Sequence, residues 1–201
     1  MTGLLTVAKM KITFGSVVVS AGLSGILSFC SLAIAIGSEY WYIIEDNRPN
    51  YGEGSHSGLF RTHEGDKVYT FTADTKSYSD LEKHMHNMHT AIIVLLPLSL
   101  VMLVFGGICA LVSSLARSSS LLLGTASYVL LSSVLTLSGV CLYISYSHQA
   151  LEETERRLGP EQLANVHTSF GWSLGMAWLS FILEVLEGLL LFLASRMVVP
   201  P

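Results

Sequence analysis

Four long stretches of this chain carry no Lys, Arg, Asp or Glu, and two polar segments of unequal length separate them. The uncharged stretches are Ile12–Ile36, Thr90–Ala116, Ser118–Ser147 and Thr168–Leu183, the last continuing past two acids to Ser195. A bilayer core needs about 20 apolar residues per helix, and backbone groups in lipid must be satisfied internally. The pattern therefore predicts four membrane-spanning helices rather than a β-barrel, whose strands would be short and alternating.

The composition supports a chain that lies mostly in the membrane. Only 13% of the 201 residues are charged, whereas a soluble domain has about 25%. We expect one domain over residues 1–201, with spans at about 12–36, 90–116, 120–147 and 170–195 and outer loops at about 37–89 and 148–169. The first stretch is much longer than the roughly 7–15 apolar residues of a signal peptide, so we interpret it as a retained anchor.

The distribution of basic residues predicts which side of the membrane each end occupies. Lys9 and Lys11 precede the first span, whereas Glu39 and Glu45 follow it. Lys and Arg near span ends favour the cytoplasmic side. We therefore expect both termini to be cytoplasmic and both longer loops to lie outside.

The two outer loops show the alternation and turn residues of short strands. Strands are predicted at Glu39–Ile44, Ser57–Thr62, Lys67–Thr72 and Asn165–Phe170. Helical segments are predicted beside the membrane at Ser79–His89, leading into the second span, and at Gln149–Leu158, continuing the third. The expected fold class is an all-α membrane protein, a four-transmembrane-helix bundle with a small extracellular β-sheet.

A short motif in the first outer loop carries a family resemblance. Trp41 follows the first span, and Gly58, Leu59 and Phe60 follow later in the loop. This arrangement resembles the claudin-like tetraspan superfamily, which includes claudins, the peripheral myelin protein 22, epithelial membrane protein and MP20 group, and the gamma-type auxiliary subunits of calcium channels and AMPA receptors. The resemblance implies a claudin-like bundle, with Trp41, Gly58, Leu59 and Phe60 as the family motif.

The chain departs from that family at its cysteines. Family members usually pin the extracellular sheet with a disulfide, but His63 stands where the first cysteine is expected. The three cysteines, Cys30, Cys109 and Cys141, all fall inside apolar stretches. We therefore expect packing of Trp41, Leu59 and Phe60 onto the helix tops to hold the sheet.

Two acids in the fourth span are candidates for an intramembrane polar site. Glu184 and Glu187 lie three residues apart and so on one side of a helix. A charged acid at mid-bilayer costs about 2.5–3.5 kcal/mol. One hypothesis is an ion or proton relay or a contact with a partner helix. The alternative is a pair that faces the bundle, protonated or bonded to serines.

A histidine-rich segment precedes the second span. His84, His86 and His89 alternate there with methionines, and imidazole and thioether groups suit copper or zinc. No nearby cysteine or acid completes a ligand set, so no metal and no cofactor is assigned. Histidine titrates near neutral pH, which makes these three residues a candidate pH-sensing cluster.

Small residues recur along the first two spans at four-residue spacing. The first span has Ser16, Ser20, Ser24 and Ser28, and the second has Gly106, Ala110 and Ser114. Such stripes let helix backbones approach closely. They predict contacts within the bundle or, alternatively, a face for the helix of another protein.

The function predicted from these patterns is non-enzymatic. The chain has no phosphate-binding loop, nucleophile elbow, zinc-protease motif or basic nucleic-acid patch. It lacks the broken helices and repeats of transporters. The resemblance implies a plasma-membrane protein that acts by lateral and extracellular protein–protein interaction, as a claudin-like membrane or junction organiser. The alternative is an auxiliary gamma-type subunit of a calcium channel or ionotropic glutamate receptor. Expected partners are the lipid bilayer and other membrane proteins, namely self-copies, junctional proteins or a channel or receptor.

The gamma subunits in that superfamily also suggest where such a partner would dock. Docking is expected through the third and fourth spans. Leu substituted at Gly171 or Gly175 should then disrupt assembly.

Overall fold

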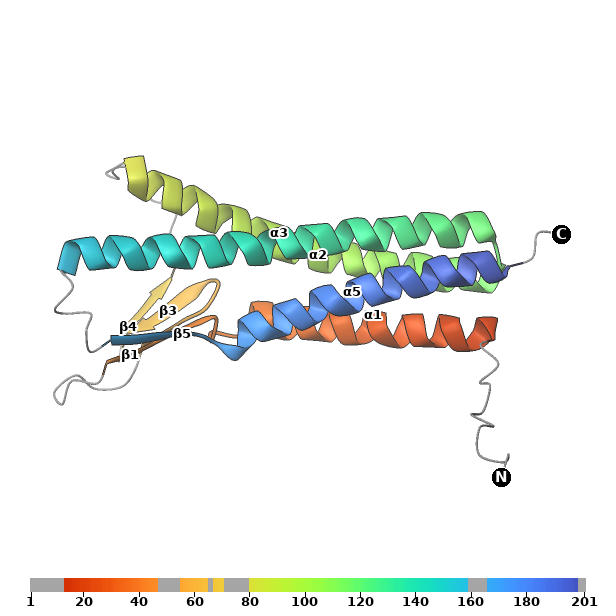
Figure 1. Cartoon of the computed structure of the whole chain (residues 1–201), viewed down its shortest axis with the longest axis horizontal. Helices are drawn as coiled ribbons and strands as arrows, with labels where there is room; N and C mark the ends of the chain where they lie inside the picture. Colours follow the sequence, from red (N-terminus) through yellow and green to blue (C-terminus); the bar gives the residue numbers. More distant parts are fainter. Residues whose placement is uncertain (1–12, 47–54, 65–66, 71–79, 159–165, 199–201) are drawn as a thin grey trace, which may run out of the picture.

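Four long helices run side by side and carry a small sheet at one end (Figure 1). The computed structural model describes residues 13–46, 55–64, 67–70, 80–158 and 166–198. The helices are α1 (Phe14–Gly37), α2 (Asp80–Ala116), α3 (Ser119–Leu158) and α5 (Trp172–Met197). All four are long and apolar enough to cross a membrane. The predicted fold class is confirmed.

Two of the helices are longer than a bilayer is thick. α2 has 37 residues and α3 has 40, which at 1.5 Å per residue is roughly 55 and 60 Å, against about 40–45 Å for a bilayer with its headgroup regions. The surplus lies at the sheet end (Figure 1). The predicted helical continuations before the second span and after the third are thereby confirmed.

Local contacts fix the helix ends at the end away from the sheet. Thr13 caps α1, because its side chain accepts a hydrogen bond from the Ser16 backbone while the Ser16 hydroxyl accepts one from the Thr13 backbone. α2 and α3 are joined through Arg117, whose φ of 46° is left-handed and reverses the chain. The Arg117 guanidinium lies 5.7 Å from the centre of the Phe14 ring, so this turn contacts the start of α1.

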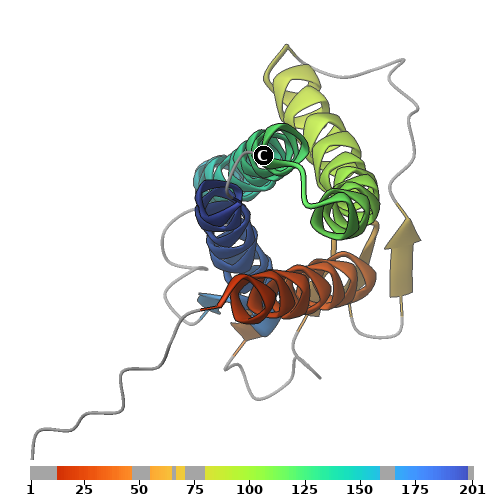
Figure 2. The ribbon, with the colours of Figure 1, turned by 90° about the vertical axis from the view of Figure 1, so that its right-hand side faces the viewer.

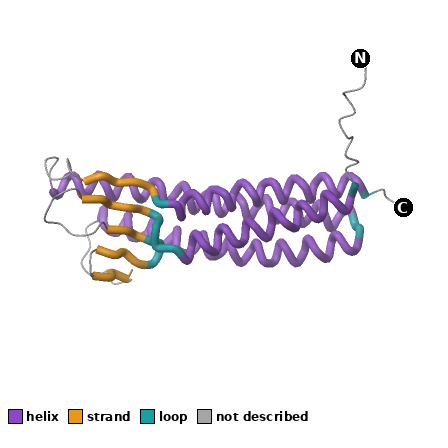
Figure 3. Tube along the Cα trace, turned by 90° about the horizontal axis from the view of Figure 1, so that it is seen from below, coloured by secondary structure: helices purple, strands orange, loops and turns teal. Residues whose placement is uncertain are grey.

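The sheet has five antiparallel strands in the order β4-β3-β2-β1-β5. They are β1 (Tyr42–Asp46), β2 (Ser55–Ser57), β3 (Arg61–Glu64), β4 (Lys67–Thr70) and β5 (Val166–Phe170). β5 comes from the segment between α3 and α5 and pairs with β1 from Tyr42↔Phe170 to Asp46↔Val166. Figure 3 shows the strands together beyond the ends of α1 and α5 and alongside the extended parts of α2 and α3. Two segments distant in sequence therefore close one sheet.

The prediction of one strand over Ser57–Thr62 is wrong. β2 ends at Ser57 and β3 begins at Arg61, with a turn between them in which the Gly58 N–H donates to the Arg61 carbonyl at 2.8 Å. A Cβ on Gly58 would lie 2.7 Å from the Glu39 Cα. The turn is possible because glycine permits this approach to the backbone, a tertiary contact that alternation does not reveal.

The strand predicted at Glu39–Ile44 begins later, at Tyr42. The chain bends at Trp41, whose side chain is completely buried, although its backbone still bonds to Ser57 and Gly171. The last two residues of the predicted strand Lys67–Thr72 lie outside the described residues.

Viewed along the bundle, the helices follow one another around its axis in the order α1, α2, α3, α5 (Figure 2). α1 packs closely on α5, and α3 packs closely on both α2 and α5, whereas α1 and α2 touch much less. Ser28 of α1 and Ser180 of α5 exchange hydrogen bonds, since each hydroxyl reaches the other residue's carbonyl at 3.0–3.1 Å. The bundle is therefore closed on three sides and loose on the α1–α2 side.

Candidate functional site

Trp41 joins the sheet to the helices. Its side chain is fully buried, and the indole N–H donates to the Ala35 carbonyl at the end of α1 at 2.7 Å. Its ring packs against the Tyr143 ring of α3, with 4.7 Å between the ring centres. Because Trp41 immediately precedes β1, it fixes the first strand to two helices at once.

The Gly58–Phe60 turn is the second attachment of the sheet. Leu59 is 1% exposed, and its carbonyl accepts a hydrogen bond from Nε2 of His89 on α2 at 3.0 Å. Phe60 is 42% exposed, so the expectation that it packs on the helix tops is wrong. Trp41 and Leu59 hold the sheet, and the three cysteines are free.

The histidines of α2 lie in different environments. His84 is exposed, His86 is half-buried, and His89 is buried against Leu59 and Tyr146, with 5.0 Å between the centres of the His89 and Tyr146 rings. Among the described residues, no three His, Cys, Asp or Glu side chains form a group able to hold a metal ion. A role in pH sensing remains a hypothesis, centred on His89, which contacts the sheet.

Glu184 is fully buried between α5 and α3. Its Oε1 accepts hydrogen bonds from Thr136 Oγ1 at 2.8 Å and Ser180 Oγ at 3.2 Å. Within the part of the chain that the structure describes, Oε2 has no hydrogen-bond partner. Hydroxyl groups thus meet this carboxyl from two helices, as one of the two hypotheses expected.

Glu187 is directed elsewhere, toward α1. It is 3% exposed, and a Cβ added to Gly25 would lie 2.7–2.8 Å from its carboxyl atoms. Only a glycine therefore accommodates this acid without displacement. The two acids, 60° apart around a helix, face different neighbours.

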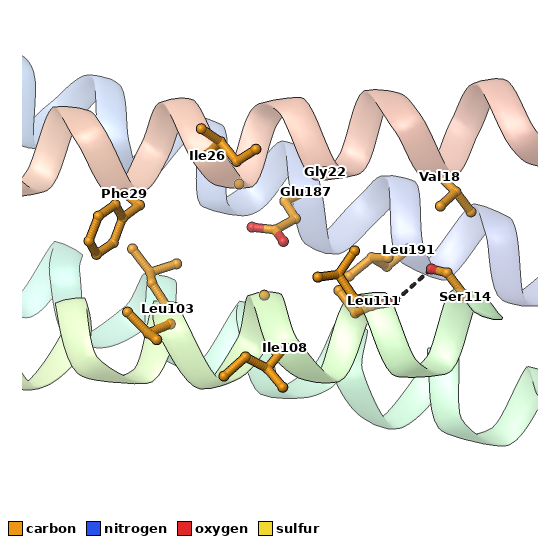
Figure 4. A pocket seen from close by; sticks show the side chains of 14 residues that line it. Val18, Gly22, Ile26, Phe29, Leu103, Ile108, Leu111, Ser114, Glu187 and Leu191 are labelled. Carbon is orange, nitrogen blue, oxygen red and sulfur yellow. Dashed lines mark hydrogen bonds between the residues drawn. The ribbon is translucent and has the colours of Figure 1, made fainter. Parts of the chain in front are cut away.

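An apolar groove of about 460 Å³ lies between α1 and α2, and Glu187 projects into it from α5 behind (Figure 4). One wall comes from α1 over Val18–Phe29 and the other from α2 over Leu103–Ser114. Apart from Glu187 and Ser114, every lining residue is apolar or glycine. The Ser114 hydroxyl donates to the Ala110 carbonyl at 2.6 Å, so it is already satisfied.

The sequence did not predict this groove. The glycines that widen it, Gly22 and Gly107, could have signalled it, since a Cβ on either would meet nothing within 4 Å. Gly171, in contrast, is buried against its own chain, because its N–H donates to the Trp41 carbonyl at 2.9 Å and a Cβ would overlap the Tyr40 carbonyl. Leu at Gly171 would therefore disturb the fold and cannot test docking, whereas Gly175 is open.

Four apolar helices under a small antiparallel sheet define a tetraspan membrane protein. The family model described as PMP-22/EMP/MP20/Claudin tight junction matches residues 26–193. The chain belongs to this family of non-enzymatic tetraspan proteins.

Similar curated proteins include the voltage-dependent calcium channel gamma-3 subunits of Rattus norvegicus and Mus musculus. Each is 26% identical to this chain over 182 residues. The match covers 80% of this chain and 55% of each relative. The chain thus spans little more than half the length of these relatives.

Proposed function

We propose that this protein acts in the plasma membrane by lateral and extracellular protein–protein contacts. The observation that carries the proposal is the joint at Trp41 and Leu59, which attaches a polar sheet to a bundle whose outer surface is apolar. This attachment lets one binding event engage both a partner's extracellular part and its membrane helices. The sheet faces outward and both termini face the cytoplasm, as the basic residues beside the first span favour.

The form of this function that we favour is an auxiliary subunit of a channel or receptor. The likeness to the calcium channel gamma-3 subunits supports it. The alternative is a membrane or junction organiser, which the family description supports. The free cysteines count against claudin-style adhesion, because the family disulfide that pins the adhesive sheet is replaced here by packing.

Short stretches of the chain also resemble transmembrane protein 235 and its relative transmembrane protein 114. These stretches lie directly after α1, within α2 and α3, at the start of α5, and on β1, β2 and β5: Ser38–Ile43, Ser55–Leu59, Leu95–Leu100, Tyr143–His148 and Ser169–Ser173. They include the contacts at Trp41 and Gly171.

The test is crosslinking in intact cells, followed by purification in mild detergent and mass spectrometry. We expect a channel or receptor subunit in fixed stoichiometry with this chain. Recovery of self-copies alone, or of junctional proteins concentrated at cell contacts, would refute the auxiliary role and favour the organiser. A variant with Trp41 changed to Ala should lose extracellular crosslinks while keeping those within the membrane.

A further inference from the structure

We propose that the α1–α2 groove is a docking site for one transmembrane helix of a partner protein, and that this helix carries a hydrogen-bond donor that meets Glu187. The proposal deepens the proposed function, since it rests on there being a lateral partner and names the face and chemistry that recognise it.

The first observation is the isolation of Glu187. Glu187 is only 3% exposed, and its carboxyl points between α1 and α2 (Figure 4). No hydrogen bond or ion pair to it is found among residues 13–46, 55–64, 67–70, 80–158 and 166–198. Its neighbour Glu184, in contrast, accepts two hydroxyl hydrogen bonds. Burying a polar group without a hydrogen-bond partner is unfavourable. The groove therefore lacks a hydrogen-bond donor for Glu187.

The second observation is the depth of this acid. Glu187 lies 15 residues after Trp172 and 10 before Met197 on α5, which is about 22 Å from one helix end and about 15 Å from the other. It is therefore within roughly 4 Å of the middle of the helix. Lipid headgroup donors lie near the surfaces of a core about 30 Å thick, and acyl chains have no donors. A lipid can fill the groove but cannot supply a donor at this depth.

A side chain on a transmembrane helix can supply that donor. The groove walls also suit a helix, because Gly22 and Gly107 leave open space on both sides and nothing lies within 4 Å of where their Cβ atoms would be. Small residues permit such close helix approach. The carboxyl accepts from Ser, Thr, Asn or Gln, and it also complements Lys or Arg, so the partner helix is identified by one such residue near mid-membrane.

The experiment is site-specific photo-crosslinking in intact cells with the full chain. Benzoylphenylalanine replaces Ile108, which lines the groove, and in a parallel sample replaces Leu131 of α3, which does not line it and is similarly exposed. Crosslinked peptides are identified by mass spectrometry. The expected product from Ile108 is an apolar transmembrane segment of another protein with a donor residue within about two helical turns of the crosslinked site.

Matched glycine variants separate blocking from misfolding. Gly107→Leu fills the groove, whereas Gly124→Leu makes the same change on α3 outside it, and neither Cβ meets a neighbour within 4 Å. We expect Gly107→Leu to abolish the Ile108 crosslink and Gly124→Leu to leave it unchanged. Glu187→Leu should reduce it about threefold to thirtyfold, the range for one interhelical hydrogen bond in a membrane.

Several outcomes would overturn the proposal. One is that the probe at position 108 crosslinks only to lipid, to this chain itself or to a second copy of it. Another is that the recovered transmembrane segment has no donor residue. A third is that the crosslink is unchanged in Gly107→Leu. Loss of the partner in Gly175→Leu but not in Gly107→Leu would place docking on the open face of α5 instead. If Leu131 captures a membrane partner and Ile108 does not, lateral interaction stands and the groove proposal fails.

Discussion

Replacing Trp41 with Ala should release the sheet from the helices without unfolding the bundle. Trp41 is fully buried, donates to the Ala35 carbonyl and packs on Tyr143. The Ala35 carbonyl also accepts from the Ser38 hydroxyl at 2.9 Å, so it keeps one partner in the variant. The loss is therefore mainly that of the indole volume and its contacts.

The expected cost follows from that burial. Truncating a buried Trp to Ala costs about 3–5 kcal/mol, a range that already contains the hydrogen bond. Much of it should be expressed as local opening, because the sheet is attached through few contacts. A change of 3 kcal/mol corresponds to roughly a hundredfold higher population of the open sheet.

Hydrogen exchange measured by mass spectrometry on the purified protein reads this directly. Peptides covering β1 and β5 should exchange about a hundredfold faster, while the middle of α3 should keep its wild-type rate. The matched control is Trp172→Ala, since Trp172 is 52% exposed and contacts Tyr40 with 6.3 Å between ring centres. Equal acceleration in both variants, or acceleration throughout the helices in Trp41→Ala, would refute the attachment argument.

Three further predictions concern the protein purified in detergent, two on its stability and one on hydrogen exchange in the sheet. Gly171→Ala should lower the thermal midpoint strongly, because the added Cβ would overlap the Tyr40 carbonyl. Gly175→Ala should leave the midpoint unchanged or raise it, because its Cβ would meet nothing within 4 Å. Similar shifts in both variants would contradict the close approach of Gly171 to Tyr40. Thr136→Val should lower the free energy of unfolding by about 1 kcal/mol, because it removes a hydrogen bond to Glu184. Equilibrium unfolding measures this, with Ser138→Ala as the control, since the Ser138 hydroxyl bonds to the Val134 carbonyl of its own helix. An unchanged free energy of unfolding in Thr136→Val would argue that this bond contributes nothing. A reductant should leave sheet exchange unchanged because all three cysteines are free, and faster exchange would reveal a disulfide.

The membrane-spanning plan follows directly from the sequence because it depends on composition alone. Stretches of uncharged residues predict helices wherever they are long enough, and the helical continuations of α2 and α3 needed only local preference. The strand boundaries depended on more. The turn at Gly58 depends on its close approach to the Glu39 backbone. The start of β1 depends on the burial of Trp41 against the helices.

The acids show the same limit at the candidate site. Spacing placed Glu184 and Glu187 on one side of a helix, yet the 60° between them directs one carboxyl to Thr136 and the other past Gly25. Which neighbour each meets depends on how α5 is rotated against α1 and α3. Gly22 and Gly107 could have signalled open space on α1 and α2, but the groove also requires that α1 and α2 stay apart, which depends on how the whole bundle packs.

The pairing of β1 with β5 sets an order of events during synthesis. β1 ends at Asp46 and β5 begins at Val166, about 120 residues later, which at ribosomal speeds takes roughly 6 to 24 s. Throughout that interval the first strand has an unpaired edge, and α1 awaits α5, the helix on which it packs most closely. A nascent chain that lacks its fourth helix therefore exposes both the edge of β1 and the face of α1 on which α5 packs, so sheet and bundle can be completed only after the last span is made.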